Sequence, residues 1–355
     1  MIFRGALPKT QNMLEMYYEK VNRIDWLDYG RGLCMLCVIL FHTWAYYVKD
    51  GRVIVDWIEP FYLTLFFFIS GYLINIDKFD IKKSLLSTIK RLVVPYLIFS
   101  SIIWIPKSIS HGISVDLLSA ICDIGGGYAN WFVPALICSR LALTLILSIN
   151  KSFKFIWIGT GFFLVAGLLL LEFVPFNMPW NMVKGFICLL YLTLGLTYRS
   201  YENKIKSLSN TTLMLLSILY IFLMYINRYV FPFEKCIYTM SLGNVVLSDA
   251  FAYVVVSLLA ILVLVNMLKQ LPTNIKCLSY IGENSLIFYF LNTGALTVMC
   301  IVARKLGLEY KGNIMYPIVI FLIDIALMYI ASYLIMKFAP WMVGMSKKLS
   351  NHKSC

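Results

Sequence analysis

Residues 28–42 read DYGRGLCMLCVILFH, an apolar segment that carries Asp28, Arg31 and His42 at helical spacing. Asp28 precedes Arg31 by three residues, a separation that places two side chains on one side of an α-helix, where they can form an ion pair. His42 follows Arg31 by eleven residues. In a helix the two side chains then lie within roughly 20° of one face and about 16 Å apart along the axis. The segment therefore predicts a helix with a polar stripe along one side.

Each residue of this stripe also has an ordinary structural explanation. Asp28 and Arg31 could mark the end of a helix, and His42 could be a hydrogen-bonded histidine in the protein core. Ionisable side chains inside a membrane span are costly, however, and usually face the bundle interior or a water-filled cavity. Three of them on one stripe favour a functional site over three separate structural roles.

The composition places the chain among membrane proteins. Of its 355 residues, 60% are hydrophobic and only 14% are charged, whereas soluble domains contain about 25% charged residues. Long apolar runs recur from one end to the other, which predicts an all-α, polytopic membrane bundle. We expect about ten transmembrane helices, at approximately residues 29–48, 57–76, 92–110, 129–149, 153–173, 181–199, 211–230, 247–267, 283–303 and 315–338.

The distribution of basic residues predicts the orientation of these spans. The net charge of +13 would suggest nucleic-acid binding in a soluble protein, but here the 31 Lys and Arg residues collect in alternate short loops. Nineteen of them lie on the side of the amino terminus and nine on the other, with the remaining three at or inside spans. By the positive-inside rule both termini are expected to be cytoplasmic, which puts Arg31 at the cytoplasmic end of the first span and His42 in its outer half.

We expect a single transmembrane domain over residues 28–338. A basic cytoplasmic lead-in at 1–27 precedes it, and a basic cytoplasmic tail at 339–355 follows it. The densest charge cluster is the expected loop 77–91, DKFDIKKSLLSTIKR, which could serve only to set topology or could seat a polyanionic cytoplasmic cofactor. The segment 111–130 is expected to be a flexible external loop. The nine cysteines are scattered mostly within spans, and we predict no disulfide framework and no metal site.

Five motifs, taken in order, have the spacing of a known family. They are RIDWLDYGRGLCMLCVILFH (23–42), FYLTLFFFISGYL (61–73), KRLVVPY (90–96), NWFVPALI (130–137) and YIGENSLIFYFLN (280–292). Together they resemble the acyltransferase 3 family of integral membrane acyltransferases. The chain departs from the family pattern at three places. FYLT stands at 61–64 where Phe-His-Met-Pro is common, Thr88 stands where a basic residue often precedes the one matching Arg91, and Asn292 stands where a His often ends the late span.

The resemblance implies an enzyme that takes an acyl group, most commonly acetyl, from acyl-coenzyme A on the cytoplasmic side. The acceptor it implies is often a sugar hydroxyl of a surface glycan. The residues support this chemistry independently. His42 can act as the general base that a hydroxyl nucleophile needs near neutral pH. Arg31 and Arg91, at the cytoplasmic ends of the first and third spans, can bind the phosphates of coenzyme A, and Asp28 can hold Arg31 in place.

Two further residues have competing interpretations. Asp324, within FLIDIALMY of the last span, could orient His42 or pair with Arg31, as a second catalytic residue, or could simply bond to a neighbouring helix. Trp131 begins the fourth span, where an interfacial aromatic belt is the leading explanation and a surface that stacks against a sugar acceptor is the more specific one.

The sequence thus predicts an acyltransferase, an O-acetyltransferase in particular, in a cell membrane such as the bacterial inner membrane. Its partners would be the lipid bilayer, acyl-CoA (acetyl-CoA) and a glycan or glycolipid acceptor, with no nucleic acid. The alternative is a transporter of polysaccharide intermediates, because a polar stripe also suits a solute path. Transporters commonly show interrupted helices in paired halves, and no such pairing is visible in the sequence.

Overall fold

A computed structural model describes residues 24–48, 53–111, 115–174, 176–230, 247–308 and 312–345, and the regular structure in these ranges is entirely helical. Most of the expected lead-in and tail lies outside them. The long helices are α2 (Asp25–Tyr47), α3 (Val53–Tyr72), α5 (Val94–His111), α7 (Phe132–Ile149), α8 (Phe153–Phe173), α9 (Met182–Tyr201), α10 (Asn210–Tyr229), α11 (Leu247–Gln270), α13 (Ser285–Lys305) and α14 (Met315–Phe338). The short helices are α4 (Ile81–Thr88), α6 (Leu117–Gly125), α12 (Lys276–Glu283), the π-helix η1 (Ile89–Val93) and the 3₁₀ turns η2 (Pro179–Asn181), η3 (Glu202–Lys204) and η4 (Pro340–Val343).

The predicted class, an all-α polytopic membrane bundle, is confirmed. Within the described ranges eight helical segments are long and apolar enough to cross a membrane. Helices α2 and α3, which contain 23 and 20 residues, are not among these eight. The count of ten spans and the cytoplasmic position of both termini stay predictions.

Two segments expected to be loops are largely helical. Asp80 begins α4 by accepting a hydrogen bond from the Lys83 backbone N–H at 2.8 Å, and the helix continues through η1 into α5 as one segment, Ile81–Pro106. Asp116 caps α6 in the same way, through Ser119. Both predictions treated charge density or glycine content as a loop signal and missed the capping aspartates, which favour a helix start. His111, expected in the second loop, is the last residue of α5.

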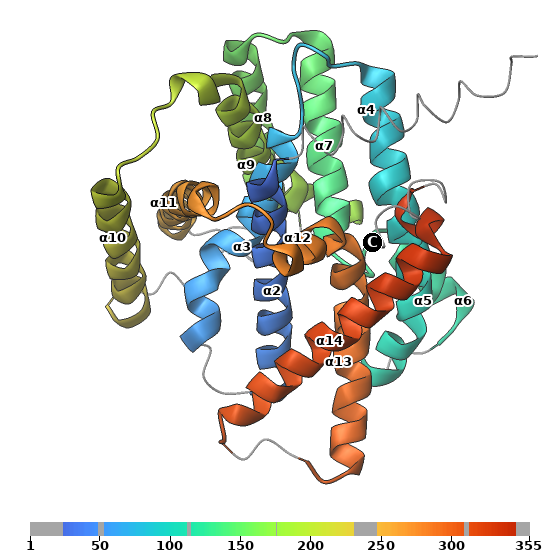
Figure 1. Cartoon of the computed structure of the whole chain (residues 1–355). Coiled ribbons are helices and arrows are strands. Elements are labelled where there is room, and N and C mark those ends of the chain that lie inside the picture. The colour runs from blue at the N-terminus through green and yellow to red at the C-terminus, as the bar shows by residue number, and fades with distance from the viewer. Residues whose placement is uncertain are drawn as a thin grey trace, which may run out of the picture.

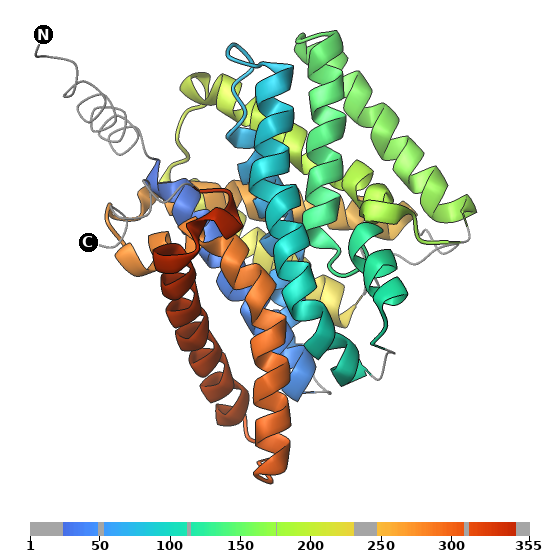
Figure 2. The same ribbon diagram turned by 90° about the vertical axis from the view of Figure 1, so that its right-hand side faces the viewer.

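Helix α2 occupies the middle of the bundle and contacts α3, α11, α12, α13 and α14 (Figure 1). Helix α9 packs against α3, α7 and α8, so these four helices form a second group beside α2. Helices α13 and α14 run next to each other toward the opposite end of the molecule from α4 and α7 (Figure 2). A residue on α2 can therefore face either group.

Glycines allow α3 and α9 to pack with their backbones in contact. A Cβ added to Gly71 would overlap the Leu192 carbonyl of α9, and one added to Gly195 would overlap the Phe68 carbonyl of α3. Small residues at helix crossings are the usual means of close packing in membranes, where van der Waals contact replaces the hydrophobic effect. This crossing fixes α3, which carries the aromatic side chains described below.

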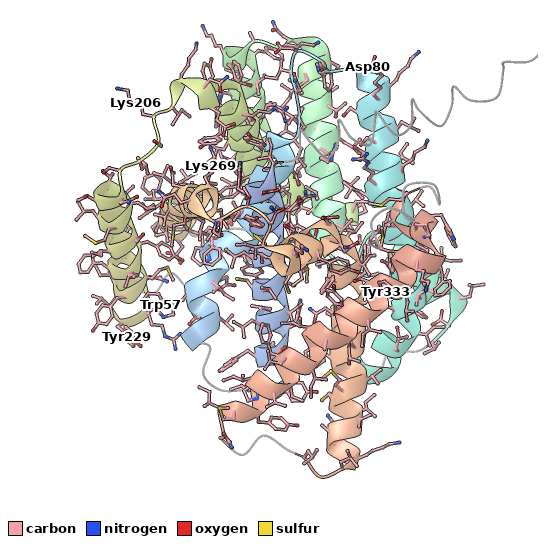
Figure 3. All side chains as sticks on the ribbon, viewed as in Figure 1. Trp57, Asp80, Lys206, Tyr229, Lys269 and Tyr333 are labelled. Atoms are coloured by element: carbon pink, nitrogen blue, oxygen red, sulfur yellow. The ribbon has the colours of Figure 1, made fainter. Side chains whose placement is uncertain are left out.

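The peripheral helices α10 and α11 are tied to the start of α3 by polar contacts. Arg228 of α10 forms an ion pair with Asp56, and the Tyr220 hydroxyl donates to the Trp57 carbonyl at 2.7 Å. The Tyr253 hydroxyl of α11 donates to the Glu59 carbonyl at 3.0 Å. In Figure 3, Trp57 and Tyr229 lie toward one end of the bundle and Asp80 and Lys206 toward the other. The loops that hold Asp80 and Lys206 thus share one side, as the charge distribution predicts.

Candidate functional site

The amino-terminal end of α2 is held by the segment that contains α12. The Tyr29 hydroxyl donates to the Pro272 carbonyl at 3.0 Å and accepts from the Ile275 backbone N–H at 3.1 Å. A Cβ on Gly32 would overlap the Leu278 carbonyl, and one on Gly282 would overlap the Asp28 carbonyl. The two helices therefore meet backbone to backbone, and this crossing fixes the position of the Asp28–Arg31 turn.

The expected pairing of Asp28 and Arg31 is present. Nη2 of Arg31 forms an ion pair with Oδ1 of Asp28, and Nε of Arg31 lies 3.4 Å from the Leu27 carbonyl oxygen. The Asp28 side chain is only 5% exposed, while that of Arg31 is 29% exposed. The aspartate thus anchors one edge of the guanidinium, and the exposed part of that group is accessible to an anion.

His42 lies near the other end of α2 and is half-buried. Its ring meets the Phe41 ring edge to face, with centroids 5.4 Å apart. One helical turn later, the Tyr46 hydroxyl and Thr297 Oγ1 of α13 lie 3.3 Å apart, which places this side of α2 against α13. His42 therefore belongs to the part of α2 that packs inside the bundle.

Aromatic side chains connect His42 to the start of α7. Phe41 stacks on Tyr62 of α3 at 6.0 Å, and one turn along α3 the Phe66 ring lies 5.5 Å from Phe132. The Phe132 ring also lies 5.4 Å from Tyr289 of α13. These two sets of contacts, joined by one turn of α3 between Tyr62 and Phe66, form an aromatic wall along α2, α3, α7 and α13.

Trp131 stands at the α7 end of this wall. Its ring lies 6.0 Å from Phe132 and carries the ammonium of Lys184 of α9 at 4.9 Å from the ring centroid, a cation–π contact. The adjoining turn is strained, because Trp180 and Asn181 both adopt left-handed backbone angles, with φ of 57° and 49°. Such strain tends to persist where a site over-determines the backbone. Trp131 and Lys184 together give this end an aromatic face with a positive charge.

Asp324 of α14 is fully buried, and neither of its carboxylate oxygens has a hydrogen-bond partner among the described residues. The structure thus shows none of the bonds proposed from the sequence, and Arg31 is engaged by Asp28 instead. Buried carboxylates normally have a partner, because an unpaired charge in a low-dielectric interior is costly. The hydrogen-bonding capacity of Asp324 is thus unmet among the described residues, and its catalytic role stays a prediction.

Two further buried polar groups were not singled out as site residues. The side-chain amide of Asn292 on α13 and the hydroxyl of Tyr47 on α2 have no hydrogen-bond partner among the described residues. Tyr47 lies within electrostatic range of Asp324, and its ring packs against Tyr316 of α14 at 5.7 Å. The departure from the family pattern at Asn292 was a signal in the sequence, whereas nothing in the sequence distinguished Tyr47 from other tyrosines.

Arg91 lies in η1 and is exposed. The described contacts do not join it to the Asp28–Arg31 pair. π-Helical turns are frequent at functional sites, and η1 interrupts an otherwise regular helix at the basic cluster Lys90–Arg91. The two arginines predicted to bind the donor therefore come from separate helices.

An apolar cavity of about 130 Å³ lies elsewhere, between α3, α9 and α11. Its lining is apolar apart from Tyr198 and Asn266, and it includes none of the predicted site residues. Among the described residues no group of three or more His, Cys, Asp or Glu side chains could hold a metal ion. Seven cysteines fall in the described ranges, and all seven are free.

Neither the curated proteins nor the solved structures gave a match. A family model described as an acyltransferase domain matches residues 24–337, which include α2 through α14 almost completely. The match covers the polar stripe of α2, the aromatic wall and Asp324. This chain therefore belongs to the acyltransferase 3 family.

Proposed function

We propose that this multi-pass membrane acyltransferase moves an acyl group, acetyl in the first instance, from acyl-coenzyme A to a hydroxyl of a cell-surface glycan or glycolipid. The plasma membrane of a bacterium is the proposed location. Family membership supports the acyltransferase activity and the membrane setting. The donor, the acceptor and the residue roles that follow are the proposal.

In the proposed reaction His42 is the general base. It removes the proton from the acceptor hydroxyl as that oxygen attacks the thioester carbonyl carbon. The tetrahedral intermediate then collapses, the carbon–sulfur bond breaks, and the leaving thiolate takes the proton from the imidazolium. The products are the ester and free coenzyme A, and the imidazole is regenerated. A neutral His is suited to this role because its ordinary pKa lies near neutrality.

The amino-terminal end of α2 is the proposed donor end. Arg31 is anchored by Asp28 and keeps a partly exposed guanidinium, which can bind a phosphate through two parallel hydrogen bonds. His42 lies about 16 Å farther along the same helix. A thioester on an extended carrier arm would reach that depth while the phosphates stay near Arg31.

The aromatic face at Trp131 is the proposed acceptor end. Sugar rings have apolar faces that pack against aromatic side chains, and Lys184 adds a positive charge above the Trp131 ring. The wall formed by Phe41, Tyr62, Phe66 and Phe132 connects this face to His42. The acceptor would thus approach the base from the α7 side.

The proposal rests mainly on one observation: the Asp28–Arg31 ion pair and His42 lie on the same helix, α2. It is tested with the purified full-length protein in lipid nanodiscs and [¹⁴C]acetyl-CoA. Labelled ester should form on membrane glycans or glycolipids from the parent strain, and a deletion strain should lack the corresponding ester on its surface glycan. Failure of the purified enzyme to consume acetyl-CoA with any such fraction, together with an unchanged glycan in the deletion strain, would reject the proposal.

A further inference from the structure

Arg140 lies within the apolar helix α7 with an incomplete set of partners. Its Nε is buried and has no hydrogen-bond partner among the described residues, and no described carboxylate forms an ion pair with it. A second cation, Arg91 of η1, lies within electrostatic range of it. The two guanidinium groups therefore repel each other, and no described acidic side chain forms an ion pair with either of them.

The packing of α4 and α5 against α7 explains how the two arginines come together. Ser84 Oγ of α4 lies 2.8 Å from Thr144 Oγ1 of α7, and the Asn130 side-chain amide donates to Ser100 Oγ of α5 at 3.3 Å. Residue numbers rise from Ser84 to Ser100 along the α4–α5 segment and fall from Thr144 toward Asn130 along α7, so the two helical segments run antiparallel. Arg140, one turn before Thr144, therefore lies level with Thr88, one turn after Ser84.

Thr88 lies three residues before Arg91, at the level of Arg140. Here Thr88 is buried, and its hydroxyl donates to the Ser84 carbonyl at 3.0 Å within its own helix. It offers no charge to a ligand. Arg140 lies at the same level on the neighbouring helix, so α7 supplies the second positive charge near Arg91.

The electrostatics of this pair favour a bound anion. An arginine cannot release its proton in a protein, so burial cannot be relieved by neutralisation. A buried charge without a partner is costly, and a second cation nearby adds repulsion. A phosphate would satisfy both guanidinium groups, since its oxygens accept bidentate hydrogen bonds from arginine and its charge cancels the repulsion.

We propose that Arg140 and Arg91 form a phosphate-binding site that holds a phosphate group of the acyl-CoA donor. This inference rests on the donor proposed above. The same chemistry could be supplied by an anionic lipid headgroup or by a free phosphate, so the experiment must separate these sources.

The experiment uses the full-length protein in phosphatidylcholine nanodiscs, which have no net lipid charge. Binding of CoA, 3′-dephospho-CoA and inorganic pyrophosphate is measured by calorimetry for wild type, Arg91→Gln, Arg140→Gln and the double variant. Arg199→Gln is the matched control, because Arg199 donates to the Tyr72 carbonyl on another side of the bundle. Each single variant at the site should bind CoA about tenfold more weakly or worse, and the control should bind as wild type does.

Three additional tests distinguish a shared site from separate effects. If both arginines bind the same phosphate, the fold-loss of CoA affinity in the double variant should be smaller than the product of the fold-losses in the two single variants. Without ligand, Arg140→Gln should melt at the same or a higher temperature than wild type, because it removes an unpaired buried charge. Arg140→Lys, which retains the charge and loses the bidentate geometry, should recover only part of the affinity.

The outcomes separate this inference from the proposed function. Equal CoA affinity in wild type and Arg140→Gln would overturn the site and leave the donor proposal standing. No CoA binding by wild type, with pyrophosphate or phosphatidylglycerol nanodiscs stabilising the protein in an Arg140-dependent way, would overturn the assignment to CoA and the proposed donor together. An Arg140→Gln protein that loses affinity for CoA but not for 3′-dephospho-CoA would support the inference and assign the site to the 3′-phosphate.

Discussion

Gly282 of α12 lies directly against the backbone of Asp28 in α2, where an added Cβ would overlap the Asp28 carbonyl oxygen and lie 3.0 Å from the Gly32 nitrogen. Gly282→Ala should therefore force α12 away from α2 and reduce the yield of detergent-stable protein. Overpacking a well-packed contact typically costs about 1–3 kcal/mol, and a backbone neighbour cannot move aside as a side chain can. Thermal unfolding in detergent measures this effect.

Gly161→Ala is the matched control for that change, because no atom lies within 4 Å of a Cβ added at Gly161 on α8. It should be neutral or slightly stabilising, since alanine is the better helix former. Equal melting temperatures for Gly282→Ala and Gly161→Ala would show that the α2–α12 crossing tolerates a wider spacing.

His42→Ala should abolish acyl transfer while the protein stays folded and inserted. Loss of a positioned general base typically lowers the rate about 10²–10⁴-fold, whereas alanine is well tolerated in a span and removes a polar group. CoA binding should persist, because the phosphates are held about three turns away. Thr43→Val serves as the control: among the described residues its hydroxyl bonds only to the Ile39 carbonyl of its own helix, at 2.8 Å. A His42→Ala protein with normal transfer per molecule but reduced yield would make His42 a packing residue.

Arg31→Ala should weaken CoA binding about tenfold or more, because it removes a charge-assisted partner of a phosphate. Arg31→Lys should restore only part of the affinity, since lysine cannot bind in a bidentate way. Asp28→Asn should also weaken binding by loosening the guanidinium that Asp28 anchors. Calorimetric titration of each variant with CoA tests the set, and unchanged affinity in Arg31→Ala would exclude Arg31 from the donor site.

Asp324→Leu should raise or maintain the melting temperature while lowering the rate of transfer. A buried carboxylate without a hydrogen-bond partner costs folding free energy, and an apolar side chain of similar size removes that cost. Ser332→Ala, two turns later on α14, is the contrasting variant, because Ser332 is buried and bonded to the Tyr280 hydroxyl at 3.0 Å. It should lose stability and keep its activity. Full activity in Asp324→Leu would remove Asp324 from the catalytic group.

Reporter fusions at Asn150 and Gly307 should report opposite sides of the membrane. Asn150 lies in the turn between α7 and α8, close to basic residues expected on the cytoplasmic side, whereas Gly307 follows α13 at the other end. A fusion after Cys355 should agree with Asn150. Agreement between Asn150 and Gly307 would reject the predicted orientation.

The spans were predictable because the bilayer imposes one length and one polarity on every crossing segment. The expected spans 153–173 and 315–338 have the same bounds as α8 and α14. Helix α4 and the following η1 were missed because their density of Lys and Arg resembles a topogenic loop. The overlooked signal in the sequence was Asp80, which begins α4 by accepting a hydrogen bond from the Lys83 backbone N–H.

The polar stripe was also predictable, because Asp28, Arg31 and His42 share one helix and helical geometry alone relates them. Contacts between helices were not. That Arg140 would lie beside Arg91, or that Tyr47 would lie near Asp324, depends on which helices pack together and at what height. Hydropathy contains no such information, since every apolar helix face can pack against every other.

Helix α2 is one continuous helix from Asp25 to Tyr47 without proline, and Gly32, the glycine between Arg31 and His42, is packed against Leu278 of α12. No break in the helix therefore separates the Asp28–Arg31 pair from the proposed base. The interval between them is set by the rise of a continuous helix, about 16 Å, and not by the packing of loops. A helix of fixed length would make the enzyme selective for the distance between phosphate and thioester in the donor. It would favour a carrier long enough to span this interval and exclude acetyl phosphate, in which the reactive carbonyl carbon is bonded directly to the phosphate oxygen.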